Sequence, residues 1–215
     1  MHEQTWKGSV TIAVLGCGRV GTALGKRWAA TGHSVLFGTH KIVSVDGLEA
    51  SGIKRDVVMP ISQAASMAEV VLLSVPYPAV EEVVQAAGGL HGKIVLDCTD
   101  PYSRSEGPFH GFRSGAEHIQ RIASGSSVVK IFNSVGYNTM ANANYDGGPP
   151  TMLYAGDNEG AKRVAHELAS SIGFEAVDVG PLDKSSLLES LANLWVALAE
   201  EQHMGYDIAF RLLRR

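Results

Sequence analysis

The stretch Val14-Leu15-Gly16-Cys17-Gly18-Arg19-Val20-Gly21 decides the fold that we predict for this chain. It is a G-x-G-x-x-G loop that directly follows an apolar run, residues 10–15, and opens a helix-like stretch, residues 20–30. In this setting Gly16 permits a tight turn, Gly18 lets the backbone approach a phosphate, and Gly21 lets the helix pack close to the strand. The free N–H groups at the start of the helix then face the anion. The stretch therefore predicts a dinucleotide-binding loop; the alternative is a glycine-rich structural turn.

The residues after the second predicted strand indicate which dinucleotide is expected. Residues 34–37 read as a short strand, after which an NAD-specific loop would place Asp or Glu to accept from the ribose 2′-hydroxyl. This chain instead has Thr39, His40 and Lys41, with no carboxylate before Asp46. A hydroxyl, an imidazole and an ammonium suit a 2′-phosphate. We therefore predict NADP(H) in preference to NAD(H); the alternative is that these three are ordinary solvated loop residues.

Short apolar runs alternate with helical stretches along most of the chain. The predicted strands are residues 10–15, 34–37, 57–59, 70–75, 93–97, 128–132, 151–155 and 175–178. The predicted helices are residues 20–30, 61–67, 79–87, 116–123 and 158–172. Several runs are continuous Val, Ile and Leu, as in strands buried on both faces of a parallel sheet. The pattern predicts an α/β fold, a Rossmann-type doubly wound, mostly parallel sheet with its ligand at the carboxyl ends of the strands.

The segment from Asp100 to Ser127 interrupts this rhythm. It is long and carries Gly, Pro, Ser and Arg together with aromatic and imidazole side chains, namely Tyr102, Phe109, His110 and Phe112. Long irregular segments in compact domains often serve as lids or binding loops. We interpret it as a substrate-side loop, against the alternative of an uninvolved surface excursion.

The tail, residues 183–215, has a different pattern. Pro181 ends the preceding segment, and Asp183 is the predicted N-cap of a helix. Apolar residues then follow at helical spacing over nearly the whole circumference, at Leu187, Leu188, Leu191, Ala192, Leu194, Trp195, Val196, Leu198 and Ala199. A helix of this kind is buried on more than one side. We therefore predict a helical extension that packs on the domain of residues 8–182 and on a partner subunit in a homodimer; the alternative is a monomeric helical cap.

Composition narrows the possible partners. The 215 residues are 45% apolar and 19% charged, and the formal net charge is −4. These values are typical of a globular chain with room for a sizeable core. No basic face is visible, so we expect neither nucleic acid nor an anionic membrane as a partner. No apolar run approaches the roughly 18 residues of a membrane span, and the first residues lack the apolar centre of a signal peptide.

The two cysteines, Cys17 and Cys98, form no CxxC pair and belong to no Cys/His cluster. We therefore expect no structural disulfide and no metal site, and a reducing cytoplasm fits the sequence. The Tyr-x-x-x-Lys dyad and the G-x-S-x-G elbow are also missing from the sequence. We therefore assign no residue a catalytic role.

A series of motifs over about residues 10 to 213 points to one family. In the first half they are residues 16–21, Phe37-Gly38-Thr39-His40, Ser74-Val75-Pro76-Tyr77 and Asp97-Cys98-Thr99-Asp100-Pro101. In the second half they are residues 130–136, 155–157, 178–182, 188–192 and 208–215. On these motifs the chain resembles the NADPH-dependent coenzyme F420 reductases and their bacterial dinucleotide-binding relatives, which share a fold with the reductase domain of STEAP metalloreductases. Gly180-Pro181-Leu182 with Leu188-Glu189-Ser190-Leu191 is far more specific than the glycine loop.

The resemblance implies a Rossmann domain with a small helical C-terminal part, usually dimeric, and NADP(H) along the strand edge. It implies that Gly18, Arg19 and Val20 meet the pyrophosphate, and that Thr39, His40 and Lys41 meet the 2′-phosphate. At the nicotinamide end it implies Ser74, Val75, Pro76, Tyr77, Val80, Thr99, Asn133 and Tyr137. The family commonly has Arg where this chain has His40, which implies relaxed or pH-sensitive cofactor choice.

Three functions are compatible with the sequence. The first is an oxidoreductase that passes hydride between NADP(H) and coenzyme F420, a deazaflavin, or a flavin such as FMN or FAD. This step needs close stacking and little proton chemistry, which suits a chain without an evident acid or base. The second is an NADPH-dependent reductase of a small organic carbonyl or imine. The third is a non-catalytic NADP(H)-binding sensor, because a Rossmann fold alone does not prove turnover.

Overall fold

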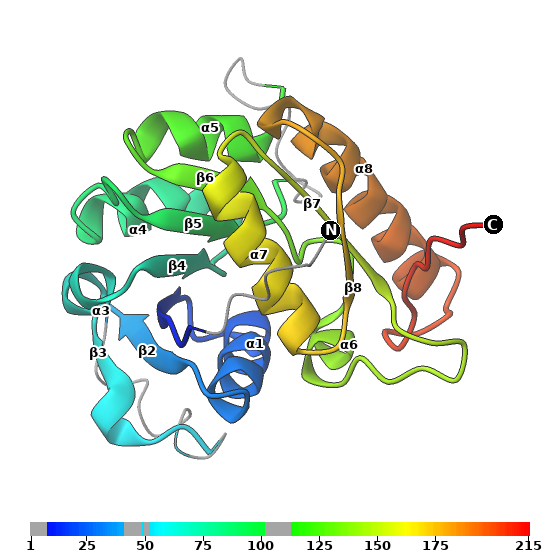
Figure 1. Cartoon of the computed structure of the whole chain (residues 1–215), viewed down its shortest axis with the longest axis horizontal. Helices are drawn as coiled ribbons and strands as arrows, with labels where there is room; N and C mark the ends of the chain where they lie inside the picture. Colours follow the sequence, from blue (N-terminus) through cyan, green and yellow to red (C-terminus); the bar gives the residue numbers. More distant parts are fainter. Residues whose placement is uncertain (1–7, 41–48, 50–51, 102–112) are drawn as a thin grey trace.

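The computed structural model of the chain describes residues 8–40, 49, 52–101 and 113–215. They form one eight-stranded sheet with helices on both faces (Figure 1). The strands are β1 (Thr11–Leu15), β2 (Ser34–Thr39), β3 (Val58–Pro60), β4 (Val70–Leu73), β5 (Ile94–Asp97), β6 (Ser127–Lys130), β7 (Thr151–Gly156) and β8 (Glu175–Asp178). The helices are α1 (Arg19–Ala30), α3 (Ile61–Met67), α4 (Val80–Ala86), α5 (Gly115–Ile122), α6 (Tyr137–Ala141), α7 (Glu159–Ser171) and α8 (Ser185–Val196).

The strand order is β3-β2-β1-β4-β5-β6-β7-β8. All neighbouring strands run parallel except β6 and β7, which are antiparallel. The order reverses between β1 and β4, and in such a sheet the ligand crevice lies outside the carboxyl ends of the strands at that point. The predicted Rossmann-type, mostly parallel α/β fold is confirmed.

The sheet separates two hydrophobic cores. Successive residues of a strand point to opposite faces, so Ile12 and Val14 enter one core while Ala13 and Leu15 enter the other. The first core is closed by α1 and α7, and the second by α3, α4 and α5. Because both faces of the sheet are covered, its central strands are apolar at consecutive positions, as their sequence predicted.

The side chain of Trp28 connects α1 to α7. Its side chain is fully buried, and its indole Nε1–H donates to the carbonyl of Leu168 on α7 at 3.0 Å. The ring also meets Phe132 edge-on, with 5.7 Å between ring centroids. Burial of such a ring together with a satisfied N–H fixes the angle at which α1 leaves the phosphate loop.

The predicted elements are present, with ends that shift by one or two residues. The run predicted as a strand to Phe132 ends at Lys130, because Phe132 takes a left-handed φ of 64° that turns the chain. The short helix α6 was not predicted from the sequence. Residues 102–112, with the aromatic side chains of the proposed substrate-side loop, lie outside the described residues, so that interpretation stays a prediction.

The predicted tail helix is present as α8, which continues into a π-helical turn, Ala197–Glu201. The predicted N-cap is wrong: Asp183 lies in a preceding 3₁₀ turn, Leu182–Lys184, and Lys184 is the N-cap without a side-chain hydrogen bond. Beyond α8 the chain returns to the sheet, where Thr151 accepts from the N–H of Leu212 and donates its own N–H to the carbonyl of Phe210. None of the helices in the described residues is long and apolar enough to span a membrane.

The first testable prediction concerns Gly21. A β-carbon there would overlap the carbonyl oxygen of Gly16 and lie 2.5 Å from the Ser74 hydroxyl oxygen. We expect Gly21→Ala to lower the free energy of unfolding by about 1–3 kcal/mol through overpacking, measured by urea denaturation. Gly18→Ala is the matched control, because a β-carbon at Gly18 meets nothing within 4 Å. Equal stability of the two variants would contradict the prediction.

Candidate active site

The glycine loop is fastened to the end of the neighbouring strand. Gly16 has a φ of 110°, and its carbonyl oxygen accepts a hydrogen bond from the Ser74 hydroxyl at 2.8 Å. The N–H of Ser74 donates to the carbonyl of Leu15 at 2.9 Å. A β-carbon at Gly16 would lie 2.5 Å from the carbonyl oxygen of Ser74. The turn is therefore held closed by contacts between the ends of β1 and β4, at the reversal of strand order.

The start of α1 is arranged to receive an anion. Gly18 is the N-cap and supplies no side-chain acceptor, and the first turn contains no acidic residue. The orphan N–H groups of this turn and the positive end of the helix dipole therefore point to the space above the loop. Arg19 begins the helix there, and Val20 packs against the first core.

The end of β2 adds a pocket beside the loop. Thr39 and His40 line a cavity of about 250 Å³. Its remaining lining residues are Gly16, Cys17, Gly38, Ile61, Val75 and Val83. The structure thus brings two of the three residues proposed for the 2′-phosphate next to the glycine loop, while the third, Lys41, lies outside the described residues. The sequence argument missed Glu82 of α4, whose Oε1 lies 3.8 Å from Nε2 of His40.

The segment after β4 follows the same edge of the sheet. Pro76 precedes a 3₁₀ turn, Tyr77–Ala79, that leads into α4. Val75 lines the cavity near Thr39, whereas Val80 is buried in the second core. Ser74, Val75 and Tyr77 are therefore at the carboxyl edge, where a cofactor site is expected.

Tyr77, His118 and Glu81 form a chain of three titratable groups. The phenol oxygen of Tyr77 lies 2.7 Å from Nδ1 of His118 on α5, and Nε2 of His118 lies 3.0 Å from Oε1 of Glu81. Burial raises the pKa of Tyr77 to about 12, and the carboxylates of Asp97, Glu189 and Glu81 act in the same direction. His118 is buried while Glu81 is largely exposed, so the chain connects solvent with the interior beside β4.

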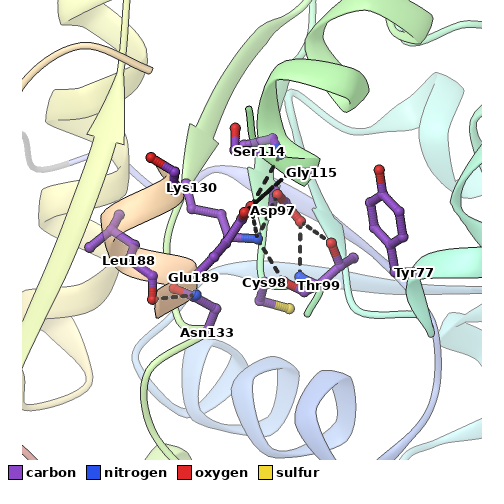
Figure 2. A network of polar contacts seen from close by, with 12 residues as sticks. Tyr77, Asp97, Cys98, Thr99, Ser114, Gly115, Lys130, Asn133, Leu188 and Glu189 are labelled. Atoms are coloured by element: carbon purple, nitrogen blue, oxygen red, sulfur yellow. Dashed lines mark hydrogen bonds and ion pairs between the residues drawn. The ribbon is translucent and has the colours of Figure 1, made fainter. Parts of the chain in front are cut away.

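Beneath this edge lies a buried cluster of charges, shown in Figure 2. The Lys130 ammonium lies 2.9 Å from Oδ2 of Asp97 and 3.4 Å from Oε1 of Glu189, and all three side chains are fully buried. Lys130 also donates to the carbonyl oxygen of Thr99 at 2.6 Å. Glu189 in turn accepts from the N–H groups of Gly115 and Ala116. The cluster therefore joins β5, β6, the start of α5 and α8.

The pKa directions follow from this arrangement. Burial alone would lower the pKa of Lys130, but the carboxylates of Asp97 and Glu189 raise it above its ordinary value. Burial raises the pKa of Glu189, against the opposing effect of the Lys130 ammonium. The N–H groups at the start of α5 favour the ionised form of Glu189. Burial also raises the pKa of the neighbouring Cys98 thiol, which argues against a reactive thiolate.

Two of the remaining predicted site residues, Thr99 and Asn133, lie beside this cluster. Thr99 is buried, and both its N–H and its hydroxyl donate to Oδ1 of Asp97. Asn133 follows the left-handed residue Phe132 and donates to the carbonyl of Leu188 at 3.0 Å, while its buried Oδ1 has no partner among the described residues. Tyr137 begins α6, where the guanidinium of Arg19 lies 5.3 Å from its ring centroid.

Apart from Lys41, which lies outside the described residues, and Val80, which is buried in the second core, the structure places the predicted residues along the carboxyl edge of the sheet. It also shows partners that were not predicted. Lys130 and Glu189 were noticed only as parts of motifs, without a role. A signal was available, because a lysine within the apolar run Val128-Val129-Lys130-Ile131 and a glutamate on an apolar helix each need a buried partner. Cys17 and Cys98 are free thiols, and the described residues contain no group of three or more His, Cys, Asp or Glu suited to a metal.

Several known proteins are similar to this chain in sequence. Residues 11–101 match the family described as NADP oxidoreductase coenzyme F420-dependent. The chain is 29% identical over 205 residues to the F420-dependent NADP reductase of Methanocaldococcus jannaschii, covering 87% of this chain and 91% of that protein. The predicted relationship to these NADP oxidoreductases is confirmed. The metalloreductase STEAP3 of Rattus norvegicus is 26% identical over 180 residues, which are 84% of this chain and 36% of STEAP3.

Solved structures of the NADP oxidoreductase family and of other reductases share the fold. A protein from Arthrobacter sp. FB24, provisionally assigned as an F420-dependent NADP reductase, superposes with a TM-score of 0.84 at 25% identity, covering 96% of this chain and all of that one. A reductive aminase from Aspergillus terreus gives a TM-score of 0.65 at 18% identity, over 91% of this chain and 63% of its own, and shows the fold alone. The names of the homologues confirm the prediction of an NADP-dependent oxidoreductase.

The second testable prediction concerns the charge cluster. Lys130→Met would leave two carboxylates buried without their cation, so we expect the free energy of unfolding to fall by about 3–5 kcal/mol. Urea denaturation measures this change. The exposed Lys54→Met is the control and should stay within about 0.5 kcal/mol of the wild type. A loss below about 1 kcal/mol for Lys130→Met would show that the cluster is not held by its ammonium.

Proposed function

We propose that the chain transfers hydride from NADPH to a flavin or to the deazaflavin coenzyme F420. The proposal rests on the carboxyl ends of β1, β2 and β4. There the start of α1, which is arranged to receive an anion, lies next to the cavity lined by Thr39 and His40. The similarity to F420-dependent NADP reductases supports the class of acceptor. In this reaction the hydride leaves the nicotinamide for the acceptor ring, NADP⁺ remains, and a proton from solvent completes the reduced acceptor.

The chain's own residues would bind and orient the two rings. Gly18, Arg19 and Val20 would hold the pyrophosphate at the start of α1, where N–H groups lack other acceptors. Thr39 and His40 would contact the 2′-phosphate, and Glu82 lies 3.8 Å from Nε2 of His40. Ser74, Val75, Pro76, Tyr77, Val80, Thr99, Asn133 and Tyr137 remain our proposed surroundings of the nicotinamide end. Close stacking in such a site supplies most of the required orientation.

A second candidate function is favoured by the contacts of Tyr77. Reduction of a small carbonyl or imine needs a proton donor beside the hydride acceptor, and the Tyr77–His118–Glu81 chain could supply one from solvent. The phenol is kept protonated because its pKa is raised to about 12. This candidate would use the same NADPH site with a different acceptor.

The assay that separates these functions is NADPH oxidation, followed by absorbance, with coenzyme F420, FMN and FAD offered separately. Turnover with one of them would support the first proposal and name the acceptor. Tight NADPH binding with no turnover on any of them, but turnover on cyclic imines or ketones, would favour the second. Tight binding without any turnover would instead indicate a sensor.

The third testable prediction concerns cofactor choice. Thr39→Ala combined with His40→Ala removes two groups proposed to contact the 2′-phosphate. Charge-assisted hydrogen bonds contribute about 1.5–3 kcal/mol each, so we expect the loss of two of them to raise the Kd for NADPH about a hundredfold or more. The Kd for NADH, which lacks that phosphate, should stay within about threefold. Calorimetric titration measures both, with Thr31→Ala at the far end of α1 as control. Equal losses for the two cofactors would sink the 2′-phosphate assignment.

We also propose that α8 forms the interface of a homodimer. Its inner face is buried through Leu188, Ala192 and Trp195, whereas Leu187 and Leu194 are 64% and 50% exposed. Exposed leucines on one helical face are typical of an interface when they adjoin further apolar residues.

A cytoplasmic location remains our proposal as well, because two free thiols suit a reducing compartment.

The fourth testable prediction follows from that face. Leu187→Glu with Leu194→Glu should convert a dimer to a monomer, since two buried carboxylates at the interface would lack partners. Analytical ultracentrifugation measures the mass, and circular dichroism checks that the fold is kept. Leu213→Glu, at an exposed leucine outside α8, is the control and should leave the mass unchanged. A wild type that sediments as a monomer at micromolar concentration would overturn the proposal.

A further inference from the structure

A carboxylate lies beside the place that we propose for the 2′-phosphate of the cofactor. Oε1 of Glu82 on α4 is 3.8 Å from Nε2 of His40, the residue that follows the end of β2. The next residue of α4, Val83, lines the cavity that Thr39 and His40 also line. Helix α4 therefore contributes to the wall of this cavity and holds Glu82 beside it.

This carboxylate comes from a different element than in a typical NAD site. In NAD-specific Rossmann domains an Asp or Glu close to the end of the second strand accepts a hydrogen bond from the ribose 2′-hydroxyl. Here the end of β2 carries Thr39 and His40, and Glu82 is supplied later in the chain by α4. A hydroxyl and an imidazole can donate to a 2′-phosphate, whereas a carboxylate only accepts. The cavity thus combines groups that suit each of the two cofactors.

The charge beside the cavity does not favour a phosphate alone. Among the described residues that line it, His40 is the one side chain that can carry a positive charge. A phosphate monoester carries about two negative charges near neutral pH. When His40 is protonated, the pair that it forms with Glu82 has no net charge, and when His40 is neutral the pair is negative. In both states the pair attracts a phosphate less than His40 would without Glu82.

Both members of the pair can reach a ligand. The side chain of His40 is 46% exposed and that of Glu82 is 76% exposed. An exposed ion pair of this kind contributes little to stability, so a cofactor separates the two groups easily. The imidazole is then able to meet a phosphate, and the carboxylate is able to accept from a hydroxyl.

We propose that Glu82 is a specificity-determining residue that reduces the preference of the site for NADP(H) over NAD(H). Its carboxylate repels the 2′-phosphate of NADP(H), and it accepts a hydrogen bond from the 2′-hydroxyl of NAD(H). The inference rests on the proposed function, because it uses the same dinucleotide site, and it adds NADH as a second cofactor that this site binds. Since the pair faces solvent, the repulsion weakens as ionic strength rises.

The test measures the Kd of NADPH and the Kd of NADH by calorimetric titration at neutral pH and low ionic strength. The wild type is compared with Glu82→Gln, which removes the charge and nearly keeps the shape of the side chain, and with Glu82→Lys, which reverses the charge. The matched controls are Glu201→Gln and Glu201→Lys, at an exposed glutamate in the π-helical turn after α8. Circular dichroism checks that each variant is folded, and Lys41 is the same in all of them.

The measured quantity is the ratio of the Kd for NADH to the Kd for NADPH. We expect Glu82→Gln to raise this ratio about fivefold or more and Glu82→Lys to raise it further, because the changed charge acts on a phosphate far more strongly than on a hydroxyl. Both Glu201 variants should leave the ratio within about twofold of the wild type. The effect of the Glu82 variants should shrink when salt is added.

Two results would overturn the inference while the proposed function stands. The first is a ratio that stays unchanged or falls in both Glu82 variants although NADPH is still bound. The second is a wild type that binds NADPH but has no measurable affinity for NADH, because Glu82 would then leave the discrimination intact. If the folded wild type binds neither dinucleotide, the proposed function is overturned and the inference falls with it.

Discussion

The buried Lys130 ammonium holds the carboxyl edge of the sheet together. It meets Asp97 from β5 and Glu189 from α8, and Glu189 in turn receives the first N–H groups of α5. Charges taken out of water must be paired, and removal of one partner costs far more than the pair contributes. The positions of three elements around the proposed nicotinamide end therefore depend on a single cation.

Similar polar contacts hold the loops at the carboxyl edge of the sheet in position. The loop after β1 is held by the Ser74 hydroxyl, and the segment after β5 is held by Lys130 at the end of β6. The groups around Lys130 are fully buried, so their hydrogen bonds are satisfied only in one arrangement. Such rigid support is what hydride transfer requires, because the two reacting rings must be held within a narrow range of distance and angle.

Much of this structure was predictable from the sequence, for identifiable reasons. Continuous apolar runs such as Val70-Val71-Leu72-Leu73 and the glycine spacing at residues 16–21 act locally, so they predicted strands, helices and the loop. The end of β6 was misplaced because Phe132 adopts a φ that its sequence neighbours do not announce. Asp183 was misread as an N-cap because a 3₁₀ turn comes first. The contacts of Lys130, Glu189 and Glu82 depend on tertiary packing, which brings together residues that no short pattern connects.

The long span of the charge cluster has a consequence for how the chain is made. Glu189 bonds to Gly115 across 74 positions, and Lys130 reaches Asp97 across 33. During synthesis β5 and β6 leave the ribosome well before α8, so Lys130 and Asp97 exist for a time without the carboxylate that completes their site. Domains that close through late, long-range contacts fold slowly and expose unfinished surfaces. The nascent chain cannot complete this edge until α8 has emerged.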